Sequence, residues 1–274
     1  MTQNTPIRMA FIGFGEVGQR FSADFSATGR VVIAAYDILF HVPDRGAACI
    51  AAANDGGIGI APNAASACEA AHVVISAVTA DAVETVAREA RHYLAPGQIF
   101  LDVNSAAPST KQRAARDVEA AGAHYVEGAV MAPVAKLGIG VPILAGGPFA
   151  EQTAALLRDL GMNITAVAYE HGKASTIKLC RSIMIKGLEA LMIDCARAAK
   201  TGDVEREVYG SLAETFPSID WPALAEIMVA RVARHGKRRA AEMREAADML
   251  GDMGLDASLA LAVAEAQGRG AARS

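Results

Sequence analysis

Residues 7–12 form an unbroken apolar run that leads directly into three glycines at a fixed spacing, G-x-G-x-x-G. The apolar run is typical of a buried strand, and residues 16–28 after it have helical spacing. At such a junction the first glycine permits a tight turn, the second lets a ligand approach the backbone, and the third lets helix and strand pack closely. The free N–H groups at the start of the helix attract phosphate. We therefore predict that this loop binds the pyrophosphate of a dinucleotide. Its residues are Gly13, Phe14, Gly15, Glu16, Val17 and Gly18.

The next predicted strand, residues 31–36, is followed by Asp37, about 20 residues after Gly18. A carboxylate at this position accepts hydrogen bonds from the adenosine ribose and repels a 2′-phosphate. We therefore expect NAD as the cofactor. NADP is not excluded, because Arg45 is near enough in sequence to meet a phosphate. A glycine-rich turn and a turn aspartate without a ligand are the alternative interpretation.

Short apolar runs and helix-like stretches alternate from the N-terminus to about residue 168. Continuous apolar strands that alternate with helices are typical of a parallel sheet covered on both faces. We therefore expect an α/β fold, a doubly wound parallel sheet of the Rossmann type, with Asp81 and Ser109 as helix N-caps. The further predicted strands are residues 73–78, 99–103, 125–130, 142–145 and 164–168, and the further helices are 81–93, 109–121 and 149–160.

After residue 172 the strand-like runs stop and helical spacing takes over. The 274 residues also exceed what one hydrophobic core usually holds. We expect a dinucleotide-binding Rossmann domain over residues 1–170, followed by an all-α domain for substrate binding and dimerisation over residues 171–274.

The stretch 173–200 contains no proline and has apolar residues on several helix faces. A helix of this composition is expected to be buried nearly all round. One small helical domain does not offer enough cover for it, so we expect a homodimer. One apolar set has helical spacing and consists of Ile177, Cys180, Met184, Leu188, Leu191 and Cys195, and the other faces carry Leu179, Ile183, Ile185 and Ile193.

Composition and charge exclude several classes of protein. The net charge is −4, so no overall basic charge draws the chain to nucleic acid. No apolar run approaches the roughly 20 residues of a membrane helix, and residues 1–6 lack the features of a secretory signal. The four cysteines lie in apolar surroundings without a C-x-x-C pair, which indicates buried thiols in a reducing cytoplasm. The six histidines do not have metal-ligand spacing, so no metal site is expected.

Four segments follow one another at plausible spacing: the glycine loop, DVNS at 102–105 with Pro108, YVEGAVM at 125–131, and GKASTIK at 172–178. Together they resemble the motifs of the β-hydroxyacid dehydrogenases, the family of 3-hydroxyisobutyrate dehydrogenase and 6-phosphogluconate dehydrogenase. The resemblance covers about the first 200 residues. The C-terminal part is similar to a smaller branch of the family.

The resemblance places Lys178 at the position of the family's catalytic lysine. Residues three and four apart share one helix face, so Arg181 and Ser182 are expected beside Lys178, near the nicotinamide. Such a lysine exchanges a proton with the substrate hydroxyl, while Arg181 lowers its pKa or binds an anionic group and Ser182 bonds to the reacting oxygen. The alternative is an ordinary solvated lysine, and His171 is a weaker candidate for proton transfer.

The remaining expected site residues lie at strand ends, where open α/β sheets bind ligands. Ala77, Val78 and Asn104 are assigned to the cofactor, and Ser105 is assigned to the substrate. Met131, Ala132 and Pro133 occupy the family's substrate-binding segment, but they replace its usual serine and two glycines. Pro133 has no N–H, so the usual recognition of a carboxylate is not expected there. Lys237, in a basic run over 237–239, either lies on a solvated helix face or reaches the substrate.

The resemblance implies an NAD(P)-dependent dehydrogenase for a 3-hydroxy acid or a related polar alcohol. Ile185 stands where decarboxylating members carry a glutamate, so no assisted decarboxylation is expected. One alternative is a reductase of C=N bonds, which Lys178 opposes because such enzymes usually replace the lysine. The other is a non-catalytic dinucleotide-binding protein, which Met131 and Pro133 favour.

Overall fold

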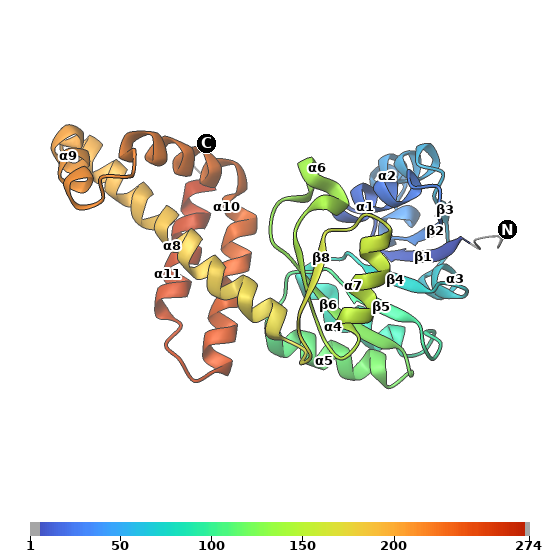
Figure 1. The fold of residues 1–274 in the computed structure, drawn as a ribbon. Helices are drawn as coiled ribbons and strands as arrows, with labels where there is room; N and C mark the ends of the chain where they lie inside the picture. Colours follow the sequence, from blue (N-terminus) through green and yellow to red (C-terminus); the bar gives the residue numbers. More distant parts are fainter. Residues whose placement is uncertain (1–5, 272–274) are drawn as a thin grey trace. The chain divides into compact units, whose positions relative to one another are not determined.

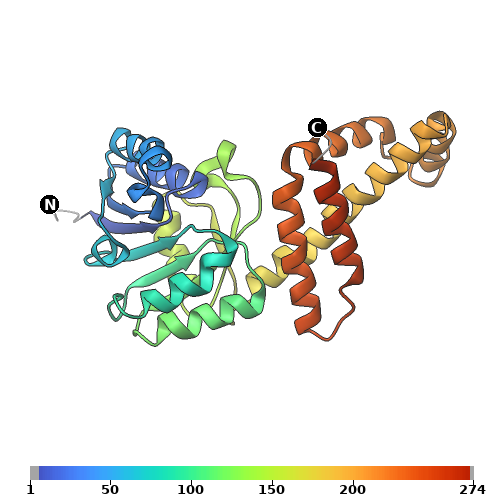
Figure 2. The same cartoon turned by 180° about the vertical axis from the view of Figure 1, so that it is seen from behind.

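The computed structural model describes residues 6–271, and they form two compact units (Figures 1 and 2). The first unit ends at Lys178 and the second begins at Leu179. The long helix α8 (Lys173–Thr201) begins in the first unit and continues into the second. No helix in the described range is long and apolar enough to cross a membrane.

The first unit is built on one sheet that has, within residues 6–271, eight strands in the order β3-β2-β1-β4-β5-β6-β7-β8. From β3 to β6 all neighbours are parallel, as predicted. At the far edge, β7 pairs antiparallel with β6, and β8 pairs parallel with β7. The strands are β1 (Ile7–Ile12), β2 (Val31–Tyr36), β3 (Gly59–Ile60), β4 (Val73–Ser76), β5 (Ile99–Asp102), β6 (His124–Val130), β7 (Ile143–Gly146) and β8 (Ile164–Ala168).

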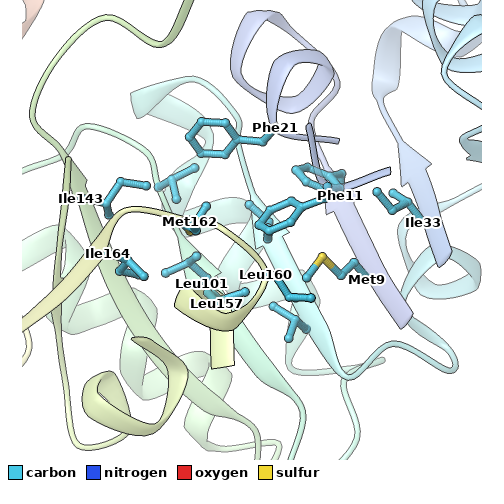
Figure 3. Packing of buried hydrophobic residues seen from close by; sticks show 14 of the residues in the cluster. Met9, Phe11, Phe21, Ile33, Leu101, Ile143, Leu157, Leu160, Met162 and Ile164 are labelled. Atoms are coloured by element: carbon cyan, nitrogen blue, oxygen red, sulfur yellow. The ribbon is translucent and has the colours of Figure 1, made fainter. Parts of the chain in front are cut away.

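Helices cover both faces of this sheet, and the alternation of side chains along the strands supplies both cores. In β1, Met9 and Phe11 point into one hydrophobic cluster, whereas Ala10 and Ile12 point into the other. Helices α1, α2 and α7 cover the first cluster, which Figure 3 shows from close by, and α3, α4 and α5 cover the second. Their bounds are α1 (Glu16–Ser26), α2 (Pro43–Asp55), α3 (Ala64–Cys68), α4 (Val83–Ala90), α5 (Pro108–Glu119) and α7 (Ala150–Asp159), with the one-turn helix α6 (Val134–Leu137) and the 3-10 turns η1 (Ile38–His41), η2 (Ala80–Ala82) and η3 (Gly138–Gly140) between them.

Both predicted N-caps are wrong. Asp81 lies inside the turn η2, and α4 begins after Ala82. Ser109 is the second residue of α5, because Pro108 takes the first helical position, which suits its fixed φ and missing N–H. The residue in the cap position is then Ala107, whose side chain makes no cap hydrogen bond.

The second unit is helical throughout its described part, as predicted. After α8 come α9 (Glu205–Thr215), α10 (Trp221–Asp252) and α11 (Ser258–Ala271). Helices α10 and α11 pack at very close range because glycines stand at their contacts. A Cβ atom on Gly236 would lie 2.3 Å from the Gln267 carbonyl oxygen, and one on Gly270 would lie 2.4 Å from Val232 Cγ1. The core of the unit joins α8, α10 and α11 through residues that include Leu179, Met243, Ala246, Met249 and Val263.

The burial predicted for the long helix is only partly correct. Leu179 and Ile193 are buried, but much of the apolar set with helical spacing is open in the single chain. Met184 is 64% exposed and Leu191 is 70% exposed, and Ile177, Cys180 and Leu188 are also exposed. The cysteines differ in the same way from the expectation of four buried thiols, since only Cys68 is fully buried among them. Burial raises the pKa of the Cys68 thiol to about 12.

Candidate functional site

The glycine loop between β1 and α1 has the three backbone features that dinucleotide binding requires. Gly13 has a φ of +92°, and a Cβ there would lie 2.3 Å from the Ala77 carbonyl oxygen. A Cβ on Gly18 would lie 2.3 Å from the Gly13 carbonyl oxygen. Gly15 differs, since its Cβ position is open space. Gly13 and Gly18 therefore serve the tight turn and the packing, and Gly15 leaves room for a phosphate at the N-terminus of α1.

The remaining loop residues contribute in different ways. The Phe14 side chain is only 1% exposed and packs into the core, so only its backbone is available to a ligand. Glu16 is exposed and Val17 is half-buried. Gln19 of α1 braces the loop, because its side-chain amide donates to the Phe14 carbonyl oxygen at 2.8 Å.

Asp37 connects the end of β2 to this loop. One carboxylate oxygen accepts the Phe14 N–H at 2.6 Å, and the other accepts the Leu39 N–H at 2.8 Å. Each carboxylate oxygen has further lone pairs, so these bonds leave acceptor capacity for ribose hydroxyls. Ile38, the next residue, is 72% exposed and offers an apolar surface beside that position. Arg45 lies in α2 and is exposed.

A buried polar network holds Asn104 at the end of β5. The Asn104 side-chain amide donates to Asp102 Oδ1 at 2.6 Å and to Ser76 Oγ at 3.0 Å. Both N–H groups of the amide are therefore used, and its carbonyl oxygen is left as an acceptor. The neighbouring residues Ala77 and Val78, at the end of β4, lie against Gly13. The structure thus brings the expected cofactor residues together at the carboxyl ends of β1, β2, β4 and β5.

The centre of this network is an ion pair that the sequence does not reveal. Lys111 Nζ lies 2.8 Å from Asp102 Oδ1, and both side chains are almost completely buried. The Tyr125 hydroxyl donates to the other Asp102 oxygen at 2.6 Å. Burial, together with the Asp102 charge, raises the pKa of Tyr125 well above its ordinary value. With its oxygens engaged in this way, Asp102 supports Asn104 and is not a free acid or base.

Residues 131–133, the segment expected to bind the substrate and called the substrate segment below, are poor in hydrogen-bond donors. The Met131 N–H is used by the Pro142 carbonyl oxygen at 2.9 Å, and Pro133 has no N–H. Within residues 6–271 the Ala132 N–H has no partner. Ser105 supplies a second group, because its buried hydroxyl oxygen has no hydrogen-bond partner in the described structure. A buried hydroxyl without a partner is uncommon in proteins, and a ligand or a water molecule at Ser105 would satisfy it.

Glu127, in β6, fixes the start of α8. Its fully buried carboxylate accepts the Ala174 N–H at 2.9 Å and the Ser175 hydroxyl at 2.7 Å. A carboxylate at a helix N-terminus satisfies free N–H groups and suits the helix dipole. Gly172, with a φ of +94°, approaches Pro108 so closely that a Cβ would lie 3.1 Å from the proline ring. The beginning of α8 therefore lies beside the loop that carries Asn104 and Ser105.

Lys178 is half-buried and is the last residue of the first unit, about one and a half turns after Gly172. Arg181 is exposed and Ser182 is buried, and both belong to the second unit. In α10, Lys237 is exposed, whereas Arg239 is buried and pairs with Glu189 of α8. Within the basic run 237–239, Arg239 therefore has a structural role, whereas Lys237 is open to solvent in the single chain.

His171 precedes α8 and has a local structural environment. Its Nε2 lies 2.8 Å from Glu119 Oε1, and its ring packs edge-on against Tyr125. Its Nδ1 is buried and has no partner among the described residues. Gly147 permits this packing, because a Cβ there would lie 2.7 Å from the ring.

Two protein families match this chain, one in its N-terminal part and one in its C-terminal part. Residues 8–168 match the family described as the NAD binding domain of 6-phosphogluconate dehydrogenase, and residues 199–269 match a domain of unknown function, DUF1932. A conserved hypothetical protein from Sinorhizobium meliloti is 38% identical, with a TM-score of 0.85 over 97% of this chain and 89% of that one.

Two further solved structures share the fold. A conserved protein of unknown function, described as structurally similar to 3-hydroxyacid dehydrogenases, is 29% identical, with a TM-score of 0.79 over 96% of each chain. The 3-hydroxyisobutyrate dehydrogenase of Mycobacterium tuberculosis is 17% identical, with a TM-score of 0.79 over 98% of this chain and 94% of that one. At this identity the last similarity concerns the fold alone.

The family match spans more than half of the chain, and its glycine loop has the backbone geometry that the pyrophosphate of a dinucleotide requires. The chain therefore belongs to the family of the 6-phosphogluconate dehydrogenase NAD-binding domain, in the β-hydroxyacid dehydrogenase superfamily, and it carries a DUF1932 domain in its C-terminal part.

Proposed function

We propose that the chain is an NAD-dependent oxidoreductase that transfers a hydride between the nicotinamide and a 3-hydroxy acid or a related polar alcohol. The observation that carries the proposal is the anchoring of α8. Glu127 and the close approach of Gly172 to Pro108 fix the first turns of this helix to the unit that holds the glycine loop. Lys178 belongs to the same unit, one and a half turns further along the helix.

The cofactor, when bound, supplies or accepts the hydride. The glycine loop and the N-terminus of α1 bind its pyrophosphate, Asp37 binds the adenosine ribose, and Asn104 offers its carbonyl oxygen to a hydroxyl. Lys178 takes the hydroxyl proton of the substrate during oxidation, as a neutral amine, and returns it as an ammonium during reduction. Ser182 bonds to the reacting oxygen, and the Ser105 hydroxyl binds another polar group of the substrate.

NADH oxidation by the purified chain, measured against a panel of 2-carbonyl and 3-carbonyl acids, tests this proposal. Turnover of a panel compound that is abolished by Lys178→Met supports it. Turnover that survives this substitution with an unchanged pH profile would remove Lys178 from the mechanism.

A second candidate function is binding of the dinucleotide without catalysis. The engaged Met131 N–H and the absence of an N–H on Pro133 favour it, because they leave the substrate segment with few donors. Tight NADH binding without oxidation of NADH by any panel compound supports this second function and rejects the first.

A further inference from the structure

Helix α8 carries a second lysine, Lys186, which the proposed reaction does not use. It lies two turns beyond Lys178 and is only 6% exposed. Its ammonium donates to Ser182 Oγ at 3.0 Å and lies 2.7 Å from a carboxylate oxygen of Glu242 in α10. A lysine in such a place is uncommon, because burial of an ammonium costs free energy unless its bonds are satisfied.

The surroundings of Lys186 contain both signs of charge. Burial is the main influence and lowers the pKa of Lys186. Among the charged neighbours, Glu242 of α10 and Glu189 of α8 raise this pKa, whereas Arg239 of α10 lowers it. Helix α11 contributes a neutral group, Gln267, whose amide donates to the Lys186 carbonyl oxygen at 3.1 Å.

The bond between Lys186 and Ser182 has a defined direction. An ammonium has three donors and no acceptor, so the serine oxygen must be the acceptor. The hydroxyl hydrogen of Ser182 then remains to be donated, and within residues 6–271 it has no acceptor. Ser182 is only 5% exposed in the single chain.

Lys178, Ser182 and Lys186 are each four residues apart in one continuous helix, so they lie along one face. In the proposed reaction Ser182 is the neutral donor beside Lys178, and it donates to the oxygen that gains or loses the proton. A serine hydroxyl rotates freely unless another group holds it. The ammonium of Lys186 is the group that holds it here.

We infer that Lys186 is a positioning residue, whose ammonium keeps the Ser182 oxygen as an acceptor so that the Ser182 hydrogen is presented to the reacting oxygen on the Lys178 face of α8. This inference rests on the proposed function. Ion pairs other than the one between Lys186 and Glu242 also join α8 to α10, because Glu189 pairs with both Arg231 and Arg239. Glu242 pairs with Arg238 of its own helix as well as with Lys186.

A double-mutant cycle on the full chain tests the inference in the NADH oxidation assay. Lys186→Met should lower kcat by about tenfold, less than the roughly 10²–10³ lost with a donor that acts directly. Because Lys186 acts through Ser182, the combined variant should be no slower than Ser182→Ala alone. Lys186→Arg keeps a cationic donor and should restore part of kcat. Lys200→Met, the same change at an exposed position in the last turn of α8, is the matched control and should leave kcat unchanged.

Additive losses in the cycle would overturn the inference, as would a Lys186→Met variant with wild-type kcat and pH profile. Failure of the proposed function has a different signature, since no panel compound is then turned over or Lys178→Met is without effect.

A measurement that needs no turnover tests whether the Lys186 ammonium donates to Ser182. In 15N-lysine-labelled protein, a buried ammonium should give an exchange-protected Nζ signal that vanishes in Lys186→Met and shifts in Ser182→Ala. Lys111, buried in the first unit, supplies a second such signal that should stay in place. A Lys186 signal that ignores Ser182→Ala refutes the orientation.

Discussion

Gly15→Ala and Gly18→Ala should impair different properties of the chain, NADH binding and stability respectively, although both glycines belong to the same loop. The Cβ position of Gly15 is open space, and its φ of −76° is one that alanine adopts. The Cβ position of Gly18 lies 2.3 Å from the Gly13 carbonyl oxygen and 3.2 Å from the Gly13 carbonyl carbon. Gly15→Ala should therefore fold normally and bind NADH poorly, whereas Gly18→Ala should lose stability.

The size of each effect follows from the geometry. Relief of the Gly18→Ala contact requires a backbone shift of about 1 Å, since ordinary contact begins at 3.4 Å. Overpacking of this kind costs roughly 1–3 kcal/mol, and the better helix propensity of alanine offsets about 1 kcal/mol. We expect a net loss near the upper end, about 2 kcal/mol, because the contact is with backbone. This loss lowers the Tm by roughly 4–8 °C. Gly15→Ala changes only the N-cap residue, at a cost of about 0.5 kcal/mol.

Thermal unfolding and NADH titration of both variants measure these effects. Gly15→Ala places a methyl group where the pyrophosphate approaches, so its NADH dissociation constant should rise at least about tenfold, or 1.4 kcal/mol. Gly140→Ala, another substitution in the first unit whose Cβ meets open space, is the control and should leave binding unchanged. Unchanged NADH affinity of Gly15→Ala would show that the phosphate does not lie at this loop. A Gly18→Ala variant as stable as the wild type would refute the packing argument.

The other predictions concern catalysis, the cofactor, assembly and pH. Lys178→Met should lower kcat by about 10²–10⁴ and keep NAD binding, and Lys178→Arg should lose nearly as much because a guanidinium keeps its proton; near-normal kcat in either variant would contradict the role of Lys178. The dissociation constant should be lower for NAD than for NADP, and Asp37→Ser should narrow the difference; tighter NADP binding in the wild type would contradict the role of Asp37. Light scattering should give a homodimer, because Met184 and Leu191 are largely exposed in the single chain, and a 28.4 kDa species at micromolar concentration would exclude it. Because burial lowers the pKa of Lys186, the unfolded chain binds more protons between that pKa and the ordinary value of 10.5. Urea unfolding should therefore show the wild type gaining stability relative to Lys186→Met as the pH rises through this window.

Local patterns were sufficient for much of the first unit. The predicted bounds of β1, β2 and β8 agree with the structure, because each is a continuous apolar run between turn residues. The region 43–68 had no predicted element and contains α2, β3 and α3. The two residues of β3 and the five of α3 are too short to show a period. The reversal of β7 also has no local signal, since strand direction is set by the path of the chain.

The buried charged residues that support the site, Lys111, Glu127 and Lys186, have a different reason for escaping prediction. Lys111 belongs to a helix and Glu127 to a predicted buried strand, and charged residues are rarely fully buried unless they are paired. Their burial depends on partners from other elements, Asp102 for the lysine and the N-terminus of α8 for the glutamate. Lys186 is similar, because Glu242 is remote in sequence. A lysine four residues beyond Ser182 is the weak signal that the sequence does contain.

The first unit provides more for the cofactor than for a substrate carboxylate. A carboxylate has about four acceptor sites. The donors without a partner among the residues assigned to the substrate in the first unit are the Ala132 N–H and the Ser105 hydroxyl. Two donors satisfy about half of that demand. We therefore expect a substrate acid to need a cation in addition, with Arg181 and Lys237 as the candidates from the sequence, whereas a neutral polar group should not need one. Comparison of each acid in the NADH panel with its amide separates these cases. A preference for acids that disappears in Arg181→Met or Lys237→Met identifies the cation, and equal rates for acids and amides show that Ser105 and Ala132 are sufficient.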